Sequence, residues 1–132
     1  MVDVSIDNAS VLFEIKGTHQ VWAMRKEIKI PFRHIREMRP DPNPPMGWWG
    51  AGLKLLGTDI PNRLKAGTFY ANGGLEFWDV QHPEKTLVVE LQNEKFKKLV
   101  IEVESPAGAI KLINDAIARR RSLDKRDRSR SS

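Results

Sequence analysis

Three histidines, His19, His34 and His82, are the side chains of this sequence best suited to acid–base chemistry or metal binding near neutral pH. They show no i,i+4 spacing, and the chain contains no cysteine that would complete a zinc site. No Gly-x-Ser-x-Gly nucleophile elbow occurs. The run Gly50-Ala51-Gly52 begins like a dinucleotide-binding loop but lacks the third glycine and the surrounding βαβ pattern. We therefore expect no catalytic residue, no metal site, no cofactor and no enzymatic activity.

A second group of side chains has the chemistry to bind anions. Seven basic residues stand between positions 16 and 39, against the acidic Glu27 and Glu37, and the first four are Lys16, Arg25, Lys26 and Lys29. Such a patch would take phosphate or an anionic phospholipid headgroup. The competing interpretation is a solvated face, balanced by the acidic residues between positions 76 and 104, and a charge run is usually a face of that kind.

The sharpest feature is a pair of adjacent tryptophans, Trp48 and Trp49, in a segment rich in glycine and proline. Glycine and proline interrupt regular secondary structure, so their frequency here predicts a long apolar loop over 40–66, which we call the Trp loop. With Leu53 and Leu56, the tryptophans would form an anchor for a protein partner or a second copy, since Trp is enriched in binding hot spots. Two alternatives stay open: the loop folds back to close one end of the fold, or it touches a membrane surface.

The net charge of the chain is concentrated at its C-terminal end. Residues 119–132 hold seven basic and two acidic side chains, and this difference of +5 equals the net charge of the whole chain. Residues 1–118 are therefore neutral. We expect 122–132 to form a disordered basic Arg/Ser tail. The tail either binds nucleic acid by charge alone or only aids solubility, and without an aromatic residue it predicts no specific nucleic-acid partner.

The elements that would position these residues are mostly strands. Alternating patterns predict strands over 11–16, 27–30 and 34–38, with a further short strand over 21–24. Four more strands follow between 67 and 104, joined by short links that predict an antiparallel meander, and Asn72-Gly73 marks its first hairpin turn. Ser105-Pro106 then starts a helix with one apolar stripe, formed by Ala109, Ile110, Ile113, Ala116 and Ile117.

A chain of 132 residues is one domain's worth, which we place at 1–121. The N-terminus is acidic and interrupted by polar residues, so it predicts no signal peptide. No segment approaches the roughly 20 apolar residues of a transmembrane helix. Together with the absence of cysteine, these features predict a soluble protein of the cytoplasm.

Several motifs of the amino-acid sequence also resemble a known family. The residues Gly67-Thr68-Phe69-Tyr70, Gly73-Gly74, Phe77-Trp78-Asp79-Val80, Pro83 and Lys85 resemble bacterial pleckstrin-homology-like (PH-like) proteins of uncharacterised function, as does the closing run from Leu99 to Val103 before Pro106. The resemblance covers roughly residues 10–118 and implies a bent antiparallel barrel of about seven strands, capped by one C-terminal α-helix. In eukaryotic relatives, basic residues near the first hairpin hold inositol phosphates, and Lys16, Arg25 and Lys29 lie in a comparable stretch.

Bacterial members of that family look more like protein-association modules than like these phosphate-binding relatives. The sequence therefore predicts a non-catalytic interaction module that binds a protein partner, or associates with itself, through the Trp loop and the adjacent barrel end. Its sites would be Trp48, Trp49, Leu53 and Leu56. The alternative is weak binding of anionic lipid headgroups by Lys16, Arg25, Lys26 and Lys29.

Overall fold

The computed structural model describes residues 1–16, 26–44, 53–60, 64–71 and 73–130, with the backbone alone at 26, 53–60, 64–65 and 129–130. Within these ranges the chain is mainly β, and the predicted class, strands followed by one C-terminal helix, is confirmed. The strands are β1 (Val2–Asp7), β2 (Ser10–Ile15), β3 (Lys26–Pro31), β4 (Ile35–Pro40), β5 (Leu53–Ile60), β6 (Leu64–Ala71), β7 (Gly74–Val80), β8 (Thr86–Leu91) and β9 (Lys98–Glu102). Two short 3-10 helices, η1 (Phe32–His34) and η2 (Pro83–Lys85), precede β4 and β8, and α1 (Pro106–Arg130) follows β9.

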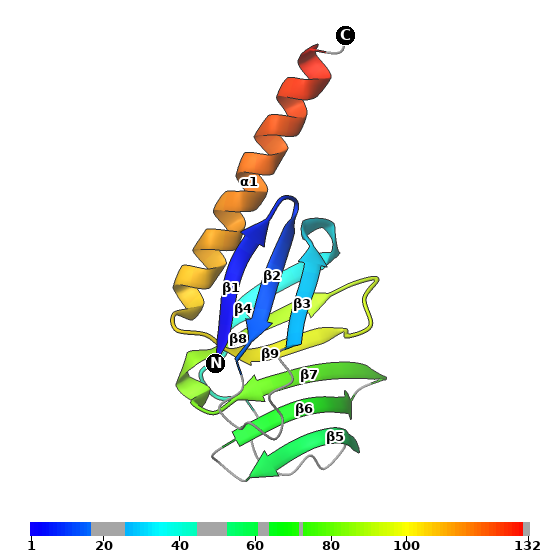
Figure 1. Cartoon of the computed structure of the whole chain (residues 1–132), viewed down its shortest axis with the longest axis vertical. Helices are drawn as coiled ribbons and strands as arrows, with labels where there is room; N and C mark the ends of the chain where they lie inside the picture. The colour runs from blue at the N-terminus through cyan, green and yellow to red at the C-terminus, as the bar shows by residue number, and fades with distance from the viewer. Residues whose placement is uncertain (17–25, 45–52, 61–63, 72, 131–132) are drawn as a thin grey trace.

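The strands form two sheets (Figure 1). The first has the order β1-β2-β3 and the second the order β4-β8-β9-β7-β6-β5. The strands of the first sheet cross in front of the end of the second sheet that contains β4, β8 and β9, and α1 runs beside β1. The described strands close no barrel, so the PH-like barrel is not confirmed.

The predicted meander between 67 and 104 is wrong in its order. β6 and β7 form the expected hairpin, but β9 lies between β7 and β8 and pairs in parallel with β7. The reason is burial on both faces of β9, where Leu99, Val100 and Ile101 expose 2% of their surface or less. An apolar run buried on both sides is most stable inside a sheet, with a strand at each edge.

One apolar core joins the two sheets and the helix. Its members come from β1, β2, β3, β7, β8, β9 and the first half of α1, and the fully buried ones include Val11, Phe13, Leu87, Val89, Leu99 and Ile113. A second cluster occupies the opposite face of the six-stranded sheet and contains Phe69, Trp78, Val80, Val88 and Val100. Both faces of this sheet are therefore buried around its central strands.

A buried acidic side chain contacts Trp78 of the second cluster. Glu76 accepts a hydrogen bond from Trp78 Nε1 at 3.1 Å, and its other oxygen lies 3.6 Å from Lys97 Nζ and 3.8 Å from Lys98 Nζ. A buried carboxylate with these partners is compensated for its loss of water.

The predicted loop over 40–66 is shorter in the structure. Residues 53–60 form β5 and pair with β6, where Gly57 stands opposite Gly67. The pattern did not indicate a strand because the register shifts between Lys54 and Leu56 and because Gly57 interrupts the run. Pairing with β6 satisfies the backbone of a segment whose own composition disfavours regular structure.

The helix starts where the sequence predicted and extends further. The Gly108 N–H donates to the Ser105 Oγ at 3.0 Å, a side-chain cap at the first turn. The structure differs from the predicted disorder of 122–132, since α1 continues to Arg130. Its docked first half supplies the helical nucleus, and Arg120 Nε lies 3.6 Å from Asp124 Oδ1 one turn later.

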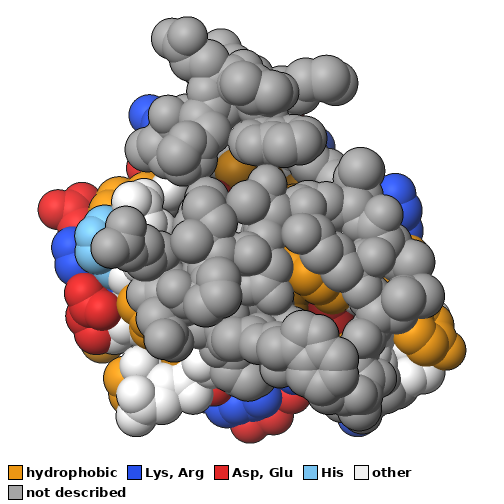
Figure 2. Space-filling view, turned by 90° about the horizontal axis from the view of Figure 1, so that it is seen from below, with side chains coloured by type: hydrophobic (Ala, Val, Ile, Leu, Met, Phe, Trp, Pro, Cys, Tyr) orange, Lys and Arg blue, Asp and Glu red, His pale blue; other side chains and the backbone are white. Residues whose placement is uncertain are grey.

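Figure 2 shows the end that carries β5, where both acidic and basic side chains of the described residues are visible at the rim. No helix in the part of the chain that the structure describes has the length and apolar character to cross a membrane.

Candidate functional site

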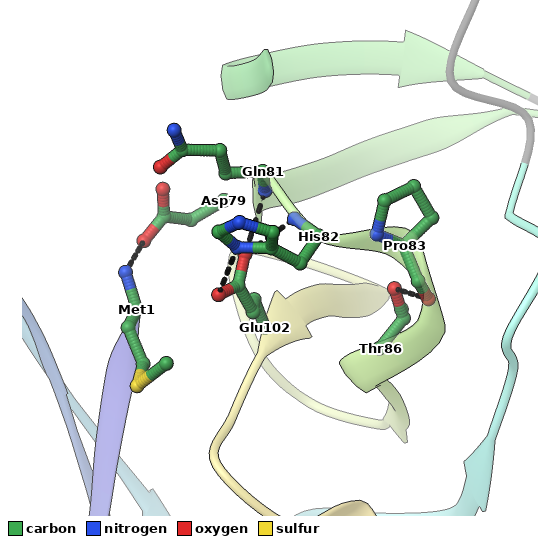
Figure 3. A network of polar contacts seen from close by, with 7 residues as sticks. All are labelled: Met1, Asp79, Gln81, His82, Pro83, Thr86 and Glu102. Atoms are coloured by element: carbon green, nitrogen blue, oxygen red, sulfur yellow. Dashed lines mark hydrogen bonds and ion pairs between the residues drawn. The ribbon is translucent and has the colours of Figure 1, made fainter. Parts of the chain in front are cut away.

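A buried carboxylate organises the turn between β7 and β8 (Figure 3). Glu102, at the end of β9, is 2% exposed. Its Oε1 accepts hydrogen bonds from the backbone N–H groups of Gln81 and His82, at 2.8 and 2.6 Å. Its Oε2 lies 3.0 Å from Nδ1 of His82, whose side chain is 55% exposed. One carboxylate thus fixes a turn and orients a half-exposed imidazole.

The pKa of Glu102 reports the strength of this arrangement. Burial of the carboxylate acts to raise its pKa, but the hydrogen bonds from His82 and Gln81 together outweigh burial and lower it. Glu102 is therefore ionised at neutral pH.

A hydroxyl lies close to this pair in the network of Figure 3 but is bonded elsewhere. The nearby hydroxyl, Thr86 Oγ1, donates a hydrogen bond to the backbone carbonyl of Pro83 at 2.7 Å and is directed away from the imidazole (Figure 3). The described residues also contain no group of three or more His, Asp or Glu side chains placed to hold a metal ion. The arrangement is suited to holding the turn beside β9.

Asp79 lies next to this network on β7. Burial raises the pKa of Asp79, and Glu102 adds to the rise, whereas the α-amino group of Met1 opposes it. The Met1 nitrogen lies 3.7 Å from Asp79 Oδ2, and no described group donates a hydrogen bond to that oxygen. Asp79 is therefore a carboxylate held in an unfavourable environment.

A second described histidine lies apart from this network. His34, in η1, contacts the Glu94 carboxylate through its Nδ1. Gln92 donates two hydrogen bonds to η1. Its backbone N–H donates to the His34 carbonyl at 2.9 Å, and its side-chain Nε2 donates to the Arg33 carbonyl at 2.8 Å. These contacts join η1 to the β8–β9 connection. His19 lies outside the described residues.

An open groove runs between β1 and the first turns of α1, where β9 leads into the helix. Its volume is about 440 Å³, and it is lined by Val2, Asp3, Val4, Val103, Glu104, Ser105, Gly108, Ala109 and Leu112. Val2, Val103 and Ala109 are buried, whereas Leu112 is 44% exposed. The lining contains two carboxylates and no Lys or Arg.

The strand along this groove has a free outer edge among the described strands, because β1 pairs only with β2. The Lys16 N–H donates to the Met1 carbonyl at 3.2 Å, which makes Met1 and Lys16 a hydrogen-bonded pair. Hydrogen-bonded and non-bonded pairs alternate along an antiparallel ladder. The backbone N–H and C=O groups of Val2 and Val4 therefore point away from β2, on the side of the groove.

Of the predicted anion-binding residues, the structure describes the side chains of Lys16 and Lys29, and both are paired with acids. Lys16 Nζ lies 2.6 Å from Asp3 Oδ2, and Lys29 Nζ lies 3.2 Å from Asp7 Oδ2. In the register of the first sheet, Asp3, Glu14 and Glu27 stand in one row across its three strands. Lys26 begins β3 and has no described side chain, and Arg25 lies outside the described residues. The two lysines are thus neutralised on a face that also carries a row of acids.

The predicted protein-binding residues are described only in part. Trp48 and Trp49 lie outside the described residues. The backbones of Leu53 and Leu56 lie in β5, which occupies an edge of the six-stranded sheet. The segment predicted as an anchor thus leads directly into an edge strand.

Sequence reasoning missed the groove and the Glu102 network. A signal for β1 was present, since Val2, Val4 and Ile6 alternate with Asp3, Ser5 and Asp7. Asn8, with φ 55, follows as a turn residue that tolerates the left-handed region. No local pattern connects Glu102 to Gln81 and His82, which lie about twenty positions earlier.

Comparisons of the chain with protein-family models, with curated proteins and with solved structures found no match. The resemblance to PH-like proteins thus stays a prediction from the sequence.

Proposed function

We propose that this protein is a non-catalytic interaction module, which binds an extended, basic segment of a protein partner as an added strand on β1. The observation that carries the proposal is the outer edge of β1 along an open groove. Strand addition of this kind takes affinity from main-chain hydrogen bonds and specificity from the side chains of the groove. The outward backbone groups of Val4, which is only partly buried, supply the first, and the groove lining supplies the second.

The lining defines the chemistry of the partner. Glu104 favours Lys or Arg in the bound segment, because opposite charges attract, whereas Asp3 is already paired with Lys16. Leu112 presents an exposed apolar surface on α1, which an apolar side chain of the segment would cover. The best-fitting partner is thus an extended peptide that combines basic and apolar side chains.

A library of unstructured peptides displayed on phage tests the proposal directly. We expect selection on the full chain to enrich peptides in which Lys or Arg flanks an apolar residue. When these peptides are added to the isotope-labelled protein, the amide NMR signals of β1 and of residues 104–112 should shift. Peptides that instead shift the signals of β4 or the β8–β9 connection would place the binding surface elsewhere and overturn the proposal.

Substitutions in the groove sharpen this test. Leu112→Arg and Glu104→Arg should each weaken the selected peptides at least about tenfold, since each adds positive charge and Leu112→Arg also removes apolar contact. Leu123→Arg is the matched control, because Leu123 is a similarly exposed leucine (46%) further along the same helix. The affinity of the Leu123→Arg variant for the selected peptides should stay within about twofold of that of the wild type.

The Trp loop is a second contact surface of the same proposed module. Trp48 and Trp49 precede the edge strand β5, and truncating a buried interface anchor typically weakens binding by about 2–4 kcal/mol. The variant Trp48→Ala/Trp49→Ala should therefore keep its melting temperature and lose self-association or partner capture in sedimentation experiments. A lower melting temperature with unchanged association would show that the tryptophans close the fold instead.

The lipid-headgroup alternative has less support. Lys16 and Lys29 are paired with Asp3 and Asp7, and a headgroup phosphate would have to displace both carboxylates. The same face presents the acidic row of Asp3, Glu14 and Glu27, which repels anions.

A further inference from the structure

The helix α1 continues well beyond the part that packs on the core. Ala109, Ile113 and Ala116 are buried and Ile117 is half-buried, whereas every residue from 118 to 128 is exposed. Figure 1 shows this end of α1 projecting past both sheets. We call residues 119–130 the arm; at 1.5 Å per residue it is about 18 Å long.

The arm carries the whole net charge of the protein. It contains seven basic residues against Asp124 and Asp127, a difference of +5, and residues 1–118 are neutral. Six of the seven basic residues are arginines. A neutral body with one projecting cationic element concentrates the positive field on that element.

The charges have a regular arrangement around the helix. At 100° per residue, Arg121, Lys125 and Arg128 follow one another at i, i+4 and i+7 and form one stripe, and Arg119 and Arg126 lie on a second stripe. The two acidic residues share the side between the stripes, which continues the packed side of α1. Asp124 is paired there with Arg120 at 3.6 Å. Both flanks of the arm are therefore purely basic.

This chemistry favours phosphate groups over the other anionic ligands. Arginine presents a planar fork of donors that matches phosphate oxygens. The arm has one apolar residue, Leu123, and hence no apolar face of the kind that inserts a helix into a membrane surface. It also lacks aromatic side chains, which single-stranded nucleic acids require for base stacking.

We propose that the arm binds duplex DNA through its phosphates, without reading the base sequence. A helix of about 10–12 Å diameter fits the major groove of B-DNA, which is about 12 Å wide, and basic stripes on its two flanks face the two phosphate backbones. Docking of the first half of α1 on the core keeps the arm helical before it binds, so binding has less conformational entropy to overcome.

Fluorescence anisotropy with a labelled 20-base-pair DNA duplex and the full chain tests this proposal. We expect binding that falls steeply with salt and is equal for two unrelated sequences, because phosphate contacts release counterions and carry no base information. The triple variant Arg121→Gln/Lys125→Gln/Arg128→Gln should bind at least about tenfold more weakly. Its slope of log affinity against log salt should fall by about 2–3.

The matched control removes the same charge from exposed positions on the body, with Arg33→Gln/Arg36→Gln/Lys95→Gln. It should keep near wild-type affinity and salt slope. Equal losses in the two triple variants, or no binding by the wild type at about 50 mM salt, would overturn the proposal. So would tighter binding to duplex RNA, whose deep, narrow major groove does not admit a helix.

Vesicles containing phosphatidylserine provide the remaining comparison. Retention of the wild type on these vesicles, with no binding to duplex DNA, would identify an anionic membrane as the ligand and overturn the proposal. The groove variant Leu112→Arg should bind DNA as the wild type does, because Leu112 lies outside the arm. A loss of peptide binding in the groove and a loss of DNA binding by the arm can therefore be told apart.

Discussion

Glu102 is the residue on which the β7–β8 turn most depends, since it accepts two backbone N–H groups while 2% exposed. Glu102→Ala removes both hydrogen bonds, and a hydrogen bond to a charged group contributes about 1.5–3 kcal/mol. We expect the variant to lose about 2–5 kcal/mol of unfolding free energy in urea denaturation.

His82→Ala is the informative comparison, because its half-exposed imidazole should contribute less than about 1 kcal/mol. The stabilising effect of Glu102 requires its ionised form. Its pKa is lowered in the folded state, so this stabilisation is present above the unfolded pKa of about 4.3 and is lost as pH falls through the folded value. Equal destabilisation by the two variants would contradict this role for the carboxylate.

Asp79 has the opposite pH dependence. Burial raises the pKa of Asp79, so its ionised form is disfavoured in the folded state. This destabilisation is absent below the unfolded pKa of about 3.9 and grows as pH rises through the folded value. We expect Asp79→Asn, which preserves the shape of the side chain, to raise the melting temperature at neutral pH.

The gain from Asp79→Asn should disappear near pH 3, where the wild-type carboxyl is also neutral. Thermal melts of both proteins between pH 3 and 8 check this. A wild type more stable than the variant at pH 7 would show that the contact of Asp79 with the Met1 amino group outweighs its burial.

At the scale of elements, α1 is two segments with different roles. The first half packs on the core through Ile113, which is fully buried, and the arm is surrounded by solvent. Ile113→Asp places an unpaired carboxylate in the core and should unfold the domain or nearly so, because burying an unpaired charge costs several kcal/mol.

Leu112→Asp, at the neighbouring and 44% exposed position, should change stability by less than about 1 kcal/mol. Far-UV circular dichroism melts of both variants make the comparison. Greater sensitivity at Leu112 would mean that α1 docks with a different face on the sheets.

For the whole molecule, the shared core predicts one cooperative unit. Phe13 of the first sheet and Leu99 of the second belong to the same cluster, and both are fully buried. Phe13→Ala and Leu99→Ala should each remove about 2–5 kcal/mol of unfolding free energy.

In both variants, denaturation followed by circular dichroism and by tryptophan fluorescence should give coincident curves, as expected for a two-state domain. Separate transitions in Phe13→Ala would show instead that the three-stranded sheet unfolds on its own.

Local patterns determined several parts of this fold from the sequence alone. The cap at Ser105, the stripe around Ile113 and the turn at Gly73, with φ 81, depend on neighbours within a few positions, and the structure has all three. The position of the net charge was likewise readable. The helical state of the arm was not, because a polar segment of that length is marginal unless a docked helix precedes it.

Contacts between distant segments were decided only by the tertiary structure. The insertion of β9 between β7 and β8 depends on cover for both of its faces, and the partners of Glu102 come from a turn far back in the chain. The groove exists because β1 and α1, from opposite ends of the sequence, lie side by side (Figure 1). A sequence pattern reports the periodicity of one segment, whereas a groove, a strand order and a buried charge depend on which other segments pack against it.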